Sequence, residues 1–112
     1  MKIYEKEKTE KRYIYIEDEY FRKIVNEEKR KIEEEGKEAE IIEGKIEEAI
    51  EKINQFQAIG SSIYTKNRKK GYKFINEVNS ENVYVNATLE KIQRPEEEKD
   101  IYYMNKNRIY EK

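Results

Sequence analysis

Residues 21–56 read FRKIVNEEKRKIEEEGKEAEIIEGKIEEAIEKINQF and carry the most regular pattern in the chain. Positions spaced alternately four and three residues apart form a heptad seam, which comprises Phe21, Val25, Glu28, Ile32, Glu35, Ala39, Ile42, Ile46, Ala49, Ile53 and Phe56. A helix that keeps this 3.5-residue repeat places the seam along one side and buries it against another helix. The pattern therefore predicts a coiled coil in which the apolar seam positions form the interface of a homo-oligomer, weakened where Glu28 and Glu35 interrupt it.

An N-cap residue and a glycine set the predicted limits of this helix. Asp18 is the expected N-cap, and Gly60 is placed as the residue that closes the helix, so the helix is expected over residues 19–59. Gly36 offers an alternative, because a helix that ended there would leave an αα-hairpin with its tip at residues 33–38. The heptad phase continues across Gly36, which favours a single helix in which this glycine costs about 1 kcal/mol.

The flanking segments have the alternating pattern of strands. Residues 11–17 include Tyr13 and Tyr15 on one face and Ile14 and Ile16 on the other, so this strand needs cover on both faces. Beyond Gly60, strands are predicted at 62–65, 72–78 and 82–89, followed by a short hairpin that pairs 101–104 with 108–110. We therefore predict a single α+β domain over residues 1–112, with a charged N-terminal arm at 1–10 and an antiparallel β-region at 61–112.

The amino-acid composition limits the kinds of catalytic and metal-binding site that the chain can form. The 112 residues are 44% charged and 36% hydrophobic, and the chain contains neither cysteine nor histidine. The usual thiol and imidazole nucleophiles, bases and metal ligands are thus missing, and the Glu33–Glu35 and Glu96–Glu98 clusters are consecutive residues that diverge on a helix. We expect no metal, no cofactor and no enzymatic activity. A chain this short of core residues favours oligomerisation, and the lack of a long apolar run predicts a cytoplasmic protein with no membrane partner.

Charge is distributed unevenly. Residues 17–51 hold 14 acidic and 7 basic side chains, a net −7, which leaves +6 for the rest of a chain whose net charge is −1. The basic excess is densest at residues 66–73, where Lys66, Arg68, Lys69, Lys70 and Lys73 could hold phosphate while Tyr72 or Phe74 stacks on a base. A solvated turn that balances the acidic helix is the alternative interpretation of the same residues.

Two functional hypotheses follow. The first is a non-catalytic homo-oligomeric binding protein that captures an anionic ligand, a nucleotide or a nucleic acid, at its basic, tyrosine-bearing β-region. The second is a small inhibitor or scaffold of the phage or mobile-element type that docks on a larger host protein through its helix or strands.

Overall fold

The computed structural model of the protein describes residues 8–86, 104–105 and 108–109. Its centre is a four-stranded sheet with the order β2-β1-β3-β4, in which every neighbouring pair is parallel. The strands are β1 (Lys8–Ile16), β2 (Ala39–Ile42), β3 (Gln57–Tyr64) and β4 (Asn82–Val85). Parallel strands require crossover connections, and each connection here contains a helix.

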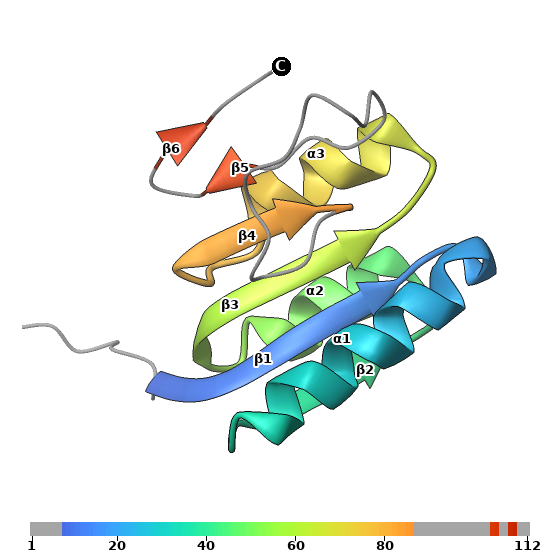
Figure 1. Ribbon diagram of the computed structural model, residues 1–112. Helices are drawn as coiled ribbons and strands as arrows, with labels where there is room; N and C mark the ends of the chain where they lie inside the picture. Colours follow the sequence, from blue (N-terminus) through green and yellow to red (C-terminus); the bar gives the residue numbers. More distant parts are fainter. Residues whose placement is uncertain (1–7, 87–103, 106–107, 110–112) are drawn as a thin grey trace, which may run out of the picture.

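Three short helices cover the sheet. A single 3-10 turn, η1 (Glu19–Phe21), leads into α1 (Arg22–Glu34), and α2 (Ile46–Ile53) and α3 (Arg68–Glu77) follow. Helix α1 lies on one face of the sheet, and α2 and α3 lie on the other (Figure 1). The described residues thus form an open α/β fold, and the prediction of an α+β fold is wrong.

Strand β1 is buried on both faces, as its sequence predicts. Ile14 and Ile16 pack in one apolar cluster with Val25 of α1, whereas Tyr13 and Tyr15 belong to a second cluster beneath α2 and α3. Near-continuous apolar sequence of this kind is typical of central parallel strands.

The predicted coiled coil is wrong, because the heptad seam is divided between two faces of the sheet. Val25, Ile32 and Ala39 are buried on the α1 face. The later seam positions, namely Ile42, Ile46, Ala49 and Ile53, are buried on the α2 and α3 face. The chain therefore covers these side chains itself, and they cannot form the seam between two helices.

Two glycines break the helical path. Gly36 has φ +84° and Gly44 has φ +109°, in the left-handed region where glycine carries no Cβ penalty. Helix α1 ends before Gly36, as in the alternative interpretation, but strand β2 follows in place of a second helix arm. Gly60 does not close a helix either, because it lies inside β3.

The predicted antiparallel region at 61–112 is also wrong. Residues 72–77 of the expected second strand belong to α3, and the third expected strand is β4, which pairs in parallel with β3. Strands β5 (Met104–Asn105) and β6 (Arg108–Ile109), of two residues each, pair antiparallel and lie within the segments of the predicted hairpin. Residues 8–10 of the expected N-terminal arm are part of β1, and residues 1–7 lie outside the described residues.

None of the helices in the described part of the chain combines the length and apolar character required to cross a membrane.

Candidate functional site

The sheet has one topological switch point, between β1 and β3. Strand β1 connects through α1 to β2 on one side, and β3 connects through α3 to β4 on the other side, with the two helices on opposite faces. Ligands of open α/β sheets bind in the crevice outside the carboxyl ends of the strands at such a point. We call the ends of β1 and β3, with the residues that follow them as far as the first turn of α3 (residues 17–21 and 65–70), the carboxyl edge.

Glu17 joins the two turns of the carboxyl edge. Its carboxylate accepts hydrogen bonds from the hydroxyl of Thr65, at 2.7 Å, and from Nζ of Lys70, also at 2.7 Å. The Thr65 hydroxyl in turn accepts a hydrogen bond from the amide of Asn67, at 2.9 Å. The hydrogen bond to Glu17 raises the pKa of Lys70, so this lysine stays charged. The start of α3 is thus held against the end of β1.

Asn86 fixes the edge from the side of β4. Its side chain accepts a hydrogen bond from the Thr65 amide and donates one to the Thr65 carbonyl, both at 2.9 Å, so it pairs with β3 as a further backbone unit would. It has φ 56°, a left-handed conformation that asparagine tolerates better than most residues. The position of Thr65, and with it the direction of the chain into α3, is therefore set from two strands.

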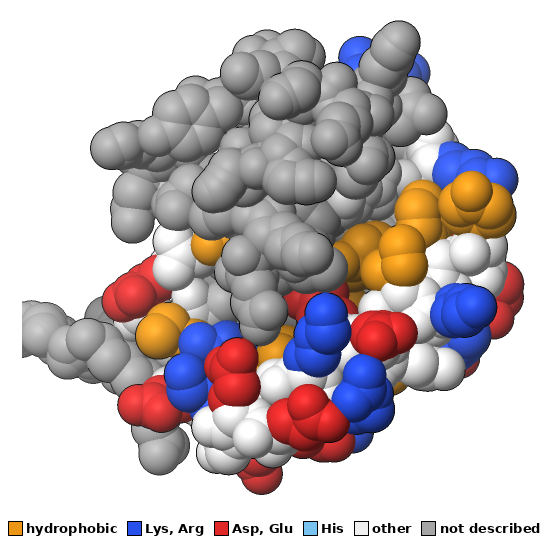
Figure 2. Space-filling view, in the orientation of Figure 1, with side chains coloured by type: hydrophobic (Ala, Val, Ile, Leu, Met, Phe, Trp, Pro, Cys, Tyr) orange, Lys and Arg blue, Asp and Glu red, His pale blue; other side chains and the backbone are white. Residues whose placement is uncertain are grey.

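An aromatic column leads from the carboxyl edge into the core. Tyr20 is 70% exposed, and its ring meets Phe21 edge-on at a centroid distance of 5.0 Å. Phe21 lies 5.6 Å from the ring of buried Tyr64, and Nζ of Lys66 lies 4.0 Å from the Tyr20 ring centroid. In the space-filling view, hydrophobic and basic side chains adjoin on the side of the molecule where β1 and β3 end (Figure 2).

Two acidic residues beside the edge, Glu19 and Glu43, share one cationic partner. Arg22 donates to both carboxylate oxygens of Glu19, at 3.1 and 2.6 Å, and to Glu43 at 2.9 Å. The hydrogen bond from Arg22 lowers the pKa of Glu19, which therefore stays charged but neutralised. Within residues 8–86, by contrast, neither Lys66 nor Lys69 forms an ion pair. Residues 17–21 and 65–70 together hold four basic and three acidic side chains, so the net charge of the carboxyl edge is +1.

The structure gathers most of the predicted ligand-binding cations at this edge. Lys66, Arg68 and Lys69 are exposed at the start of α3, where Asn67 is the N-cap and its side chain accepts from the amide of Lys70. Lys70 contacts Glu17, while Lys73 lies further along α3 and pairs with Glu77 at 3.1 Å.

The two predicted aromatic contacts differ in their exposure. Phe74 is fully buried and stacks on Tyr15 with a centroid distance of 6.1 Å, so it has no ring face to offer a ligand. Tyr72 is half-buried against the same core cluster. Sequence reasoning missed Tyr20, which nothing in the sequence distinguishes from the other nine tyrosines, and missed Glu17, Thr65 and Asn86, which come together only through the sheet order.

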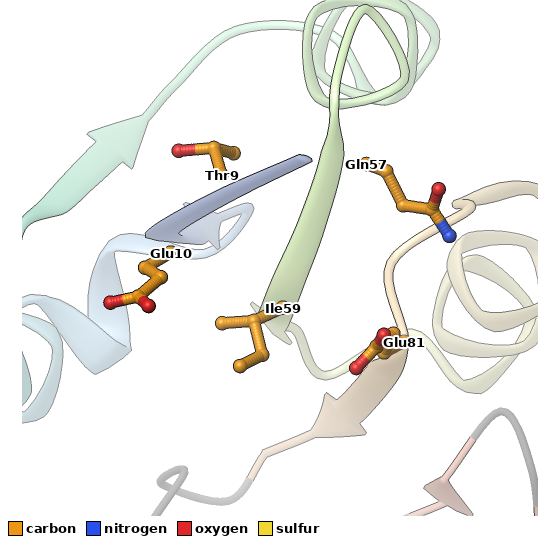
Figure 3. A pocket seen from close by; sticks show the side chains of 5 residues that line it. All are labelled: Thr9, Glu10, Gln57, Ile59 and Glu81. Carbon is orange, nitrogen blue, oxygen red and sulfur yellow. The ribbon is translucent and has the colours of Figure 1, made fainter. Parts of the chain in front are cut away.

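A separate hollow of about 310 Å³ lies near the amino ends of β1 and β3 (Figure 3). It is lined by Thr9, Glu10, Gln57, Ile59 and Glu81. Two carboxylates and no cation among these residues make it unsuited to an anion. The described residues hold no group of three or more side chains arranged to bind a metal ion.

Comparison of the chain with protein-family models, with curated proteins and with solved structures finds no match.

Proposed function

We propose that the protein is a non-catalytic binding protein that captures a phosphate-bearing ligand, a nucleotide or a nucleic acid strand, at the carboxyl edge. The proposal depends on where the topology places the basic segment. The densest basic segment of the chain, which begins at Lys66, directly follows β3 at the switch point of the sheet. That is the position at which open α/β sheets bind their ligands.

The start of α3 adds a second argument. The first amides of a helix have no acceptor within the helix, and the helix dipole makes this end positive. Arg68, Lys69 and Lys70 add three positive charges in the same turn, which destabilises a helix in isolation. Glu17 offsets the charge of Lys70, whereas Lys69 forms no ion pair within residues 8–86. A bound phosphate would be favoured at this positive helix end, as anions are at helix N-termini.

The proposal does not include a coiled-coil oligomer, because Ile42, Ile46 and Ile53 are buried inside one chain. Capture is therefore proposed for the single chain. It also keeps only part of the predicted binding set: Lys66, Arg68, Lys69 and Lys70 stay in it, whereas the buried ring of Phe74 does not.

A charge-matched pair of variants tests the proposal. Lys66→Ala/Lys69→Ala removes two exposed cations of the carboxyl edge, whereas Lys31→Ala/Lys37→Ala removes two exposed cations near the opposite end of the sheet. Binding is measured by fluorescence anisotropy with a labelled ten-residue oligothymidylate and a fluorescent ATP analogue, at 50 and 300 mM salt. We expect the first variant to bind about tenfold more weakly at low salt, and the difference to shrink at high salt because the contacts are electrostatic.

Two results would contradict the proposal. The first is equal weakening by the two variants, which would indicate a general charge effect. The second is an affinity that does not depend on salt. If neither probe binds and purification from a lysate instead yields one stoichiometric protein partner, the rival function of an inhibitor or scaffold replaces it.

A further inference from the structure

Tyr20 is the most exposed large hydrophobic side chain among the described residues. It is 70% exposed, compared with 49% for Ile24 and 36% for Phe56. It lies in η1, between the end of β1 and the start of α1, and so belongs to the carboxyl edge. The packing of the domain does not require its ring at this position, because the core is closed by Phe21 and Tyr64 beneath it.

The ring of Tyr20 is nevertheless held in a defined place. Its backbone amide donates to the carboxylate of Asp18 at 3.0 Å, and the ring of Phe21 meets it at an interplanar angle of 86°. The column continues inward to Tyr64, whose hydroxyl donates to buried Glu28 at 2.7 Å. An aromatic surface that is fixed before binding loses little conformational freedom when a ligand stacks on it.

One cation of the carboxyl edge, Lys66, lies over a face of this ring. Lys66, whose Nζ is 4.0 Å from the ring centroid, is the first residue of the basic segment, and Lys69 follows in the first turn of α3. A positively charged surface beside an exposed aromatic ring is the combination by which proteins hold the phosphate and the base of a nucleic acid together.

We infer that Tyr20 stacks on a nucleobase while Lys66 and Lys69 hold the attached phosphate, so that the site selects ligands that carry a base over bare polyphosphate. This inference rests on the proposed function, which requires only that an anion binds. It replaces the expected stacking residues, Tyr72 and Phe74, with a tyrosine from the other strand of the switch point.

The test compares three probes on four proteins. The probes are inorganic tripolyphosphate, ATP and a ten-residue oligothymidylate, and binding is measured by isothermal titration calorimetry. The proteins are the wild type, Tyr20→Ala, Tyr20→Phe and the control Ile24→Ala, which removes another exposed apolar side chain, on α1. We expect Tyr20→Ala to weaken the two base-bearing probes about tenfold and to leave tripolyphosphate within twofold of the wild type. Tyr20→Phe and Ile24→Ala should bind all three probes as the wild type does.

The outcomes separate the inference from the proposed function. If the wild type binds none of the probes, the proposed function fails and the inference with it. If the wild type binds all three but Tyr20→Ala weakens them equally or not at all, the inference alone is overturned. If Tyr20→Ala instead converts a dimer to a monomer in sedimentation experiments, with base binding intact, the ring is a contact between copies of the chain and the inference is likewise overturned. A loss limited to ATP identifies a free nucleotide as the ligand, and a loss limited to the oligonucleotide identifies a strand; either supports the inference.

Discussion

Replacing Gly36 with alanine gives effects of opposite sign in the observed fold and in a continuous helix. In the structure Gly36 has φ +84°, directly after the C-cap of α1, and a Cβ added there meets no atom within 4 Å. The substitution therefore creates no clash, and its effect comes from the backbone alone. In a continuous helix over residues 19–59, the same change would replace a glycine in a helix interior with the best helix former.

The magnitudes follow from these two backbones. A left-handed conformation costs a residue with a Cβ about 1–2 kcal/mol, and alanine recovers about 0.4–1 kcal/mol because it restricts the unfolded chain more than glycine does. We therefore expect Gly36→Ala to lower the free energy of unfolding by about 1 kcal/mol. In a continuous helix the same substitution would raise that free energy by about 1 kcal/mol. The effects expected for the two structures therefore differ by about 2 kcal/mol.

Urea unfolding followed by circular dichroism measures this difference. Gly44→Ala should also destabilise, since Gly44 has φ +109° and its added Cβ would make only an ordinary contact with Glu48. Asn26→Ala, at an exposed position inside α1, serves as the opposite control and should stabilise the protein by roughly 0.5 kcal/mol. A Gly36→Ala variant that is more stable than the wild type, like Asn26→Ala, would refute the turn at Gly36 and with it the separation of α1 from β2.

Three further predictions concern the core, the pH dependence and the site. Ile53→Ala should lower the free energy of unfolding by about 2–5 kcal/mol in urea melts, independently of protein concentration, because Ile53 is fully buried within one chain. Burial raises the pKa of Tyr15 to about 12, so the folded state favours the neutral phenol. The resulting contribution to the free energy of unfolding is complete below about pH 10 and is lost between about pH 10 and 12. Tyr15→Phe should therefore flatten the profile of melting temperature against pH in that range. Glu17→Gln keeps an acceptor for Thr65 but removes the charge that pairs with Lys70, so it should lower thermal stability while tightening oligonucleotide binding in the anisotropy assay.

The heptad pattern misled because short elements of different kinds reproduced its spacing. Within α1 the buried positions Val25 and Ile32 are seven residues apart, as a helix requires. In β2, however, the buried residues Ala39 and Ile42 are only three apart because the strand has just four residues and its two ends are buried. Short apolar runs of this length do not distinguish a strand from a helix. The sequence of β1 was the better indicator of the fold class, since a strand that is apolar on both faces is typical of a parallel sheet.

The segment after β3 held a helical period that the strand interpretation overlooked. Gly71, Phe74, Ile75 and Val78 are all buried, and their spacing of three, one and three residues is that of one face of a helix. Asn67 before them is an N-cap residue with its side chain bonded to the Lys70 amide. The alternation of Tyr72 with Phe74 suggested a strand, but it does not extend to Ile75, which is buried beside Phe74.

Charge composition predicted the cations of the candidate site, but only the fold explains why their charge remains available. Some of the acidic side chains of residues 17–51 pair locally, since Glu27, Glu33 and Glu34 contact Lys29 and Arg30 on α1 itself. Glu17 is the acidic residue that reaches across the switch point, 53 residues from its partner Lys70, and it neutralises one cation there. Within residues 8–86 neither Lys66 nor Lys69 pairs with a carboxylate, although the chain as a whole carries a net −1. A site that attracts anions can therefore exist on a nearly neutral protein, because the basic side chains that follow β3 are close together in the sequence and only Lys70 of Lys66, Lys69 and Lys70 is paired with a carboxylate within residues 8–86.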